Sequence, residues 1–238
     1  MPVVRMGLMS LILMMGLSCS TIFTSQEDCP KGVALRFIYD YNMEYANAFH
    51  SKVHCVSVYV FDDAGNHVTT VAETSDILRE ESYRMPLMLD PGNYTLLAYG
   101  GLSCPDRSFD ITDYGTKATG SHIDEMQVEL NHDGFVSDRS LHSLFYGSAE
   151  LEVPHEDAFI EKDVHMMKNT NNIRLVLQQA NGKSLEADDF IFRITDDNSL
   201  MDKENTVVPK GVVTYKPWTT GETVVGAAED GETPVSVA

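Results

Sequence analysis

The thiol of Cys19 is the side chain whose position most clearly predicts chemistry. It follows an apolar run of twelve residues, Met6 to Leu17, which Arg5 precedes. Such a run behind a positive charge is typical of a secretory signal peptide and is too short to span a bilayer. A lipoprotein signal would attach diacylglycerol to the Cys19 sulfur before the chain is cut between Ser18 and Cys19. Ordinary signal peptidase would cut the same bond and leave the thiol free; both outcomes stay open, and we expect lipidation.

The charge of the chain bears on how it would be held at a membrane. Residues 1–18 are the expected signal peptide, and residues 19–29 the expected lipid tether, which is polar from Ser20 to Asp28. The 36 acidic and 17 basic residues give a formal charge of −19, which argues against binding to nucleic acid or to anionic lipid headgroups. No apolar run is long enough to predict a transmembrane helix. Acyl chains on Cys19 would therefore provide the membrane attachment.

The remaining cysteines are Cys29, Cys55 and Cys104, an odd number that allows one disulfide and one free thiol. An exported protein enters an oxidising compartment, so a bond is expected. Three pairings are possible. We predict Cys29–Cys104, because both residues precede a proline in loop-like sequence, whereas Cys55 lies within a predicted strand. No C-x-x-C pair is present, so a redox or zinc-ribbon site has no support.

Motifs for catalysis and metal binding are all incomplete. Gly182-Lys183-Ser184 lacks the first glycine of a phosphate loop, and His155-Glu156 lacks the second histidine of a zinc hydrolase. His50 with His54 lacks the third ligand of a metal site. The turn from Asp62 to Asn66 lacks the distal glutamate of a calcium loop and predicts a plain hairpin turn. The sequence therefore predicts no catalytic residue, no metal and no cofactor, and we expect that the protein is not an enzyme.

Alternating apolar residues predict that the chain is built from β-strands. About seven strand patterns, separated by turn sequences, occur between residues 30 and 157, without a long helical pattern. The expected strands are 33–39, 53–61, 67–72, 83–89, 94–99, 123–130 and 143–153. This density of short strands favours a β-sandwich.

A second series of strand patterns follows Pro154 and predicts a second domain at 158–238. Its expected strands are 162–168, 173–178, 190–195 and 207–215. The sequence after them is polar and offers no closing strand, so we expect this domain to be incomplete. An apolar edge without a partner is expected beside residues 173–178, where another chain could add a strand.

The order and spacing of several segments resemble the anchor subunits of Bacteroidia-type (type V) fimbriae, the FimB/Mfa-type family. The resemblance covers roughly residues 10 to 225. It begins with the cysteine after the signal and continues through strand and turn sequences. These are CPKGVALRFIYDYN from Cys29 to Asn42, VYVFD from Val58 to Asp62, DPGNY from Asp90 to Tyr94, and HSLFYG from His142 to Gly147.

The resemblance implies an all-β protein with two transthyretin-like β-sandwich domains in tandem, which we place at 30–157 and 158–238. It also implies an outer-membrane lipoprotein, exposed at the cell surface, that holds a fimbrial shaft and limits its length. The implied partners are the shaft subunit and, through the lipid, the membrane.

Two other functions share part of this pattern. A surface lipoprotein that binds glycan for a nutrient-uptake system would have the same signal, acidity and sandwich fold, and would need exposed aromatic side chains gathered at one end. A secreted hydrolase is less favoured, because the sequence contains no recognisable nucleophile, base or metal set. Fold alone does not decide between these functions.

Overall fold

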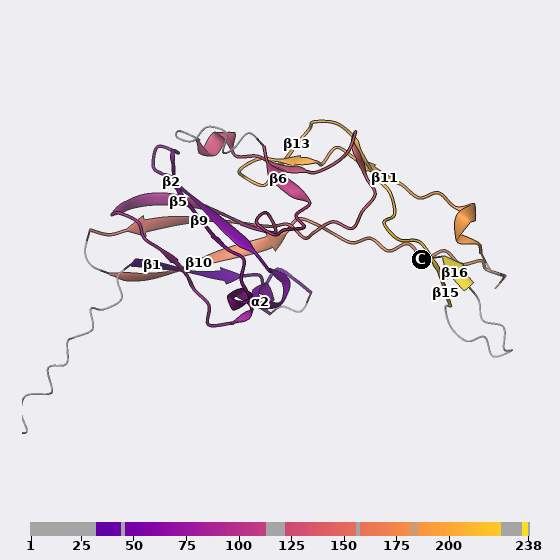
Figure 1. Ribbon diagram of the computed structural model, residues 1–238, viewed down its shortest axis with the longest axis horizontal. Helices are drawn as coiled ribbons and strands as arrows, with labels where there is room; N and C mark the ends of the chain where they lie inside the picture. The colour runs from indigo at the N-terminus through magenta and orange to yellow at the C-terminus, as the bar shows by residue number, and fades with distance from the viewer. Residues whose placement is uncertain are drawn as a thin grey trace, which may run out of the picture.

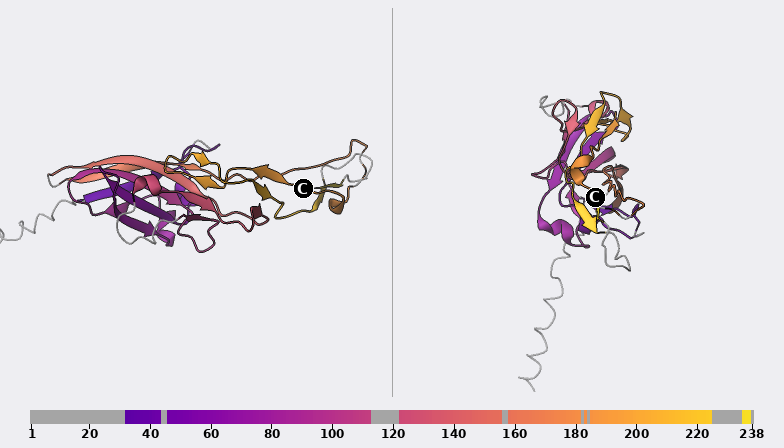
Figure 2. Two further views of the ribbon diagram at one scale, coloured as in Figure 1. Left: turned by 90° about the horizontal axis from the view of Figure 1, so that it is seen from above. Right: turned by 90° about the vertical axis from the view of Figure 1, so that its right-hand side faces the viewer.

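The structure is a computed structural model that describes residues 32–43, 46–112, 122–155, 158–181, 183, 185–224 and 235–237. The described part is an elongated, nearly all-β molecule (Figures 1 and 2). Its one α-helix is α2 (Phe49–Lys52), and its 3₁₀ turns are η1 (Asp76–Arg79), η2 (Ile123–Glu125) and η3 (Ala187–Asp189). The predicted all-β class is confirmed.

The largest sheet has seven strands in the order β3-β2-β5-β9-β10-β1-β4. Only β1 and β10 run parallel; the other neighbours are antiparallel. The strands are β1 (Gly32–Ile38), β2 (Val56–Asp62), β3 (His67–Glu73), β4 (Met85–Leu87), β5 (Gly92–Gly100), β9 (Phe145–Val153) and β10 (Phe159–Lys168).

Three smaller sheets accompany the large one. A four-stranded sheet has the order β13-β12-β7-β6, a three-stranded sheet has the order β11-β14-β8, and β15 pairs with β16. Their strands are β6 (Phe109–Ile111), β7 (Val128–Leu130), β8 (Val136–Ser137), β11 (Ile194–Asp196), β12 (Leu200–Met201), β13 (Val207–Val208), β14 (Val213–Tyr215), β15 (Glu222–Val224) and β16 (Val235–Val237).

Two hydrophobic cores lie on opposite faces of the large sheet, and β5 contributes to both. Leu96 and Ala98 point into a core that β1, β2, β4, β9 and β10 also fill. Leu97 and Tyr99 point into a second core, which the four-stranded sheet covers with residues such as Val128. Because β5 is buried on both faces from Leu96 onward, this half of the strand is a continuous apolar run rather than an alternating one.

The domain boundary predicted between residues 157 and 158 is placed wrongly. β10 follows that point directly, and it lies inside the large sheet between β9 and β1. Further along, β12 pairs with β7 and β14 pairs with β8. Strands up to Tyr215 thus complete sheets that the first half of the chain begins, and the structure does not divide there into two tandem sandwiches.

Two later segments extend beyond the seven-, four- and three-stranded sheets, toward the right-hand end in Figure 1, and carry the β15–β16 pair. We call them the distal arm, defined as the described residues 171–181, 183, 185–193, 216–224 and 235–237. β1 begins near the opposite end of the molecule (Figure 1). The start of β1 and the distal arm are therefore separated along the long axis.

Candidate functional site

Residues Ser18, Cys19 and Cys29 lie outside the described residues. The described element nearest to the expected tether in sequence is β1. The backbone N–H of Gly32 donates to the carbonyl of Ala158 at 3.1 Å. From there β1 and β10 stay in register, from Gly32 opposite Phe159 to Ile38 opposite His165. The strand nearest the tether in sequence is therefore an interior strand, held between β10 and β4.

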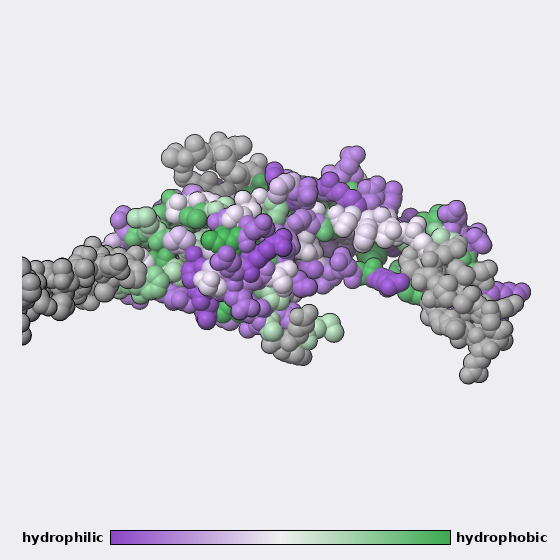
Figure 3. All heavy atoms as spheres, turned by 60° about the horizontal axis from the view of Figure 1, so that its bottom comes forward, coloured by the Kyte–Doolittle hydropathy of each residue, from purple (hydrophilic) through white to green (hydrophobic). Residues whose placement is uncertain are grey.

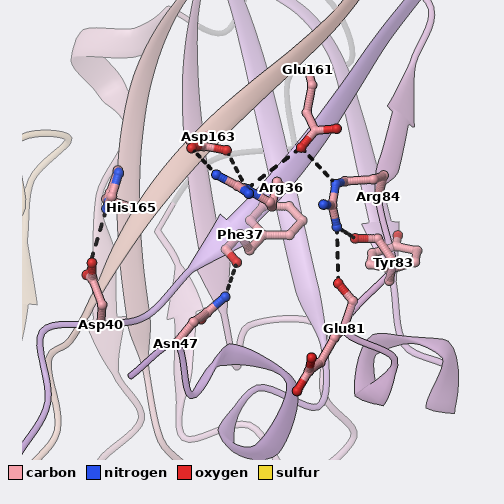
Figure 4. A network of polar contacts seen from close by, with 10 residues as sticks. All are labelled: Arg36, Phe37, Asp40, Asn47, Glu81, Tyr83, Arg84, Glu161, Asp163 and His165. Atoms are coloured by element: carbon pink, nitrogen blue, oxygen red, sulfur yellow. Dashed lines mark hydrogen bonds and ion pairs between the residues drawn. The ribbon is translucent and has the colours of Figure 1, made fainter. Parts of the chain in front are cut away.

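A charged network on the surface ties β1 to β10 (Figure 4). Arg36 donates from Nε to Asp163 Oδ1 at 2.7 Å and from Nη2 to Oδ2 at 2.5 Å. Glu161 Oε1 lies 3.8 Å from Arg36 Nε and 3.1 Å from Arg84 Nε. A two-point contact between guanidinium and carboxylate fixes direction as well as distance. The network therefore specifies the register of the parallel pair.

The same network explains the protonation of its members. The hydrogen bonds from Arg36 hold the pKa of Asp163 below its usual value, and the same bonds raise the pKa of Arg36.

Arg84 is positioned by its Nη1, which donates to the carbonyls of Glu81 and Tyr83. About 40% of the Arg36 side chain and 38% of the Asp163 side chain are exposed, so solvent screens their attraction. The role of the network is orientation more than stability.

The disulfide joins Cys55 to Cys104, so the predicted Cys29–Cys104 pairing is wrong. Cys55 lies one residue before β2, whose Val56 faces Gly100 at the end of β5. The N–H of Gly101 donates to the carbonyl of Cys55 at 3.2 Å, and the chain then turns back to bring the two Cα atoms within 5.5 Å. The β2–β5 pairing therefore selects the partner of Cys104.

Of the side chains that the sequence singled out, His50 and Asp62 make contacts with the backbone. His50 Nδ1 lies 2.8 Å from the carbonyl of Leu78, and His54 is exposed. Asp62 accepts hydrogen bonds from the N–H groups of Asn66 and Ala64, which lower its pKa, and it closes the predicted β2–β3 hairpin turn. Within the described residues, no group of three or more His, Cys, Asp or Glu side chains could hold a metal ion.

The distal arm carries exposed apolar side chains along its length. They are Ile173 at 66% exposure, Leu175 at 49%, Val176 at 46%, Ile191 at 93% and Trp218 at 57%. Figure 3 shows hydrophobic atoms on this part of the surface. Neither hydrophobic core contains a residue of the arm. Because isolated strands without a core are at best marginally stable in water, these side chains form a surface suited to a partner.

The backbone of the distal arm is only partly paired with other strands. The strand predicted at residues 173–178 does not form; its one paired position is an isolated bridge at Leu177. The strand predicted at 190–195 is reduced to β11, which begins at Ile194. Alternating apolar residues signalled strands here, but sequence periodicity does not say whether a neighbouring strand is present. The arm therefore has a sequence that favours strands but does not form a full sheet.

A shallow hollow of about 280 Å³ on the four-stranded sheet is lined by side chains such as Asp110, Glu129 and His132. Lys210 Nζ lies 2.6 Å from a Glu129 oxygen, so this carboxylate is neutralised within the protein. None of the described helices has the length and apolarity that crossing a membrane requires.

Comparisons with known proteins agree with this architecture. A family model of the fimbrillin-A associated anchor proteins Mfa1 and Mfa2 matches residues 26–235. No curated protein matches the chain. Among solved structures, a provisionally named adhesin from Bacteroides thetaiotaomicron is 44% identical, with a TM-score of 0.81 over 90% of this chain and 70% of that one.

Two further solved structures share the fold. A provisionally named adhesin from Bacteroides ovatus is 27% identical, with a TM-score of 0.72 over 92% of this chain and 69% of that one. The fimbrial anchor protein Mfa2 from Porphyromonas gingivalis is 20% identical, with a TM-score of 0.62 over 88% of this chain and 72% of that one. At 20% identity the likeness concerns the fold alone.

Proposed function

Since the chain belongs to the family of fimbrillin-A associated anchor proteins Mfa1 and Mfa2, we propose that it is a lipid-tethered base for a fimbrial shaft in the outer membrane. The match across residues 26–235 is the observation that carries this proposal. The family is one of structural proteins at the cell surface and not a known enzyme family. In this proposal the protein holds the shaft on the cell and limits its length.

The N-terminal part of the proposal concerns Cys19. Acyl chains on its sulfur, each CH₂ contributing about 0.8 kcal/mol when buried, would hold the body at the bilayer. Between Cys19 and β1 lie the twelve residues from Ser20 to Lys31. Fully extended, they would reach about 40 Å at roughly 3.3 Å per residue. This reach would let an acidic body stay clear of anionic headgroups while remaining attached.

The opposite end of the molecule would bind the shaft. The distal arm offers β-competent backbone and exposed apolar side chains, such as Ile173 and Ile191. A strand contributed by a shaft subunit would pair with this backbone and cover these side chains. The arm lies away from the start of β1 along the long axis (Figure 1). This separation supports a division of labour, with the membrane at one end and the shaft at the other.

Electron microscopy of a deletion strain tests the proposed role. Without this protein, fimbriae are expected in the medium or as abnormally long fibres, and the wild-type gene is expected to restore attached fibres of normal length. Normal attachment and normal length in the deletion strain would contradict the proposal.

A further inference from the structure

The ends of β1 and β10 lie beside the start of β9. There a hollow of about 190 Å³ is lined by Tyr39, Asn42, Met43, Ala48, Lys52, Ser143, Phe145 and Lys168. None of these residues is acidic, although acidic residues outnumber basic ones by 36 to 17 in the chain. We propose that this hollow, the lysine pocket, binds a carboxylate-bearing monosaccharide unit.

The charge of the lysine pocket is the first argument. Lys52 and Lys168 both line it, and neither side-chain ammonium group has an ion-pair or hydrogen-bond partner among the described residues. Some other cations of this protein lie beside carboxylates, as Arg36 does beside Asp163 and Lys210 beside Glu129, so those charges are already neutralised. Two ammonium groups left without partners beside one hollow favour an anion there, because a charge-assisted hydrogen bond is stronger than a neutral one.

The second argument for this ligand comes from the hydroxyl groups that line the lysine pocket. Among the described residues, the hydroxyls of Tyr39 and Ser143 make no hydrogen bond with another side chain or with the backbone. Each hydroxyl can both donate and accept. Together with the two ammonium groups, they match a ligand that carries a carboxylate and several hydroxyls. A purely apolar ligand would leave these polar groups without partners.

One wall of the lysine pocket, which Tyr39, Asn42, Ala48 and Phe145 form, is held by contacts within the protein. Asn42 Nδ2 donates to the carbonyls of Tyr39 at 2.8 Å and Ala46 at 2.7 Å, and the N–H of Ala48 donates to the Tyr39 carbonyl at 2.8 Å. The ring of Tyr39 packs edge-on against Phe145, with centroids 5.1 Å apart. A preformed wall lowers the ordering cost of binding.

The size and the apolar lining select the ligand class. A hollow of about 190 Å³ is smaller than the roughly 300–1,000 Å³ typical of sites for drug-sized ligands, so it suits a single ring. Phe145, Ala48 and Met43 offer apolar contact for the C–H face of a pyranose. The lysines would take its carboxylate. A uronic acid unit, free or at a chain end, combines these features, and this inference does not depend on the proposed fimbrial role.

Titration of the purified protein with D-glucuronate, followed by protein NMR, tests the inference. Saturable binding is expected in the millimolar range, with D-glucose and acetate each at least about ten-fold weaker, because each lacks one part of the recognised group. Lys52→Gln and Lys168→Gln should each weaken glucuronate binding by about ten-fold. Unchanged amide spectra away from the pocket would show that both variants stay folded.

Lys162→Gln is the matched control, because it removes the same charge from the same strand, β10, outside the pocket. It should leave glucuronate affinity unchanged. An equal loss in this control would mean that net charge governs binding and would overturn the proposed site. Absence of saturable glucuronate binding would also overturn it, and so would acetate binding as tightly as glucuronate.

Discussion

Arg36 and Asp163 face each other across the parallel strands β1 and β10, and two hydrogen bonds of 2.7 and 2.5 Å join their side chains. β1 is the strand nearest the expected tether, and β10 leads at Lys168 into the segment that reaches the distal arm. A pull on the start of β1 and on the end of β10 would act along both strands. Such a pull would shear the two strands, so that all seven paired positions bear the force at once instead of separating one by one.

We predict that this geometry resists force. In single-molecule pulling from residues 32 and 168, the wild-type protein should rupture at a higher force than the Arg36→Ala variant, because the variant loses the two-point contact with Asp163. Arg79→Ala is the control, since the Arg79–Asp76 pair is local to η1. Equal rupture forces for wild type and Arg36→Ala would contradict a mechanical role for this contact.

The pH dependence of stability should report the turn at Asp62. The hydrogen bonds from Asn66 and Ala64 place the folded pKa of Asp62 below the ordinary value of 3.8. Its ionised form therefore stabilises the fold fully above that value, and the contribution is lost as pH falls through the folded pKa. The destabilisation caused by Asp62→Asn should be larger at pH 7 than at pH 2.

Urea unfolding at both pH values measures this difference. Asp63→Asn removes the same charge from the neighbouring position and serves as the control for net charge. A cost of Asp62→Asn that is the same at pH 7 and pH 2 would show that the hydrogen bonds to the carboxylate do not depend on its ionisation.

Much of the large sheet was predictable because its strands carry local signals. The alternation from Val33 to Tyr39 marks β1, and the turn from Asp62 to Asn66 marks the β2–β3 hairpin. β6, β8, β12, β15 and β16 were missed, because strands of two or three residues are too short to show a period.

Two of the wrong predictions concern contacts between distant parts of the chain. The boundary at 157/158 failed because β10 pairs with β1, more than a hundred residues earlier, and no local pattern encodes that pairing. The Cys29–Cys104 prediction failed for the same reason, since the β2–β5 register brings Cys55 to Cys104. The apolar segment without a partner that was expected beside residues 173–178 corresponds to the exposed side chains of Ile173, Leu175 and Val176, although the strand predicted there does not form.

Nonreducing peptide mapping should find Cys55 linked to Cys104, with Cys29 alkylated. Both cysteines of the bond are buried, so reduction should require unfolding. With a sequence separation of 49, loss of the bond in Cys55→Ser should lower the free energy of unfolding by about 3 to 4 kcal/mol.

Cys29→Ser is the control for this experiment and should change the free energy of unfolding little. A peptide that links Cys29 to Cys104 would contradict the structure. Gly101 adds a related test, because its φ is +106° and a Cβ added there would overlap the carbonyl oxygen of Ser143. Gly101→Ala should therefore destabilise the turn that leads to Cys104.

The distal arm should bind fimbriae through its apolar side chains. Ile191→Asp changes a side chain that is 93% exposed, so the free energy of unfolding should not change measurably, while binding to purified fimbriae should fall about ten-fold or more. Met88→Asp is the matched control, because Met88 is 96% exposed but lies on the body, outside the arm.

Surface plasmon resonance with immobilised fimbriae compares the two variants. Loss of binding for Ile191→Asp but not for Met88→Asp is expected. Equal binding of both variants would contradict the arm as the docking surface.

The most direct test of the central claim is the membrane attachment of a Cys19→Ala variant in cells. Removing the thiol removes the acceptor for acyl chains, and the acidic surface cannot replace their affinity for the membrane. The variant should move from the membrane fraction to the soluble fraction, folded, with fimbriae released alongside it, whereas Cys29→Ala should stay in the membrane fraction. Retention of Cys19→Ala in the membrane fraction would contradict a lipid anchor at this residue.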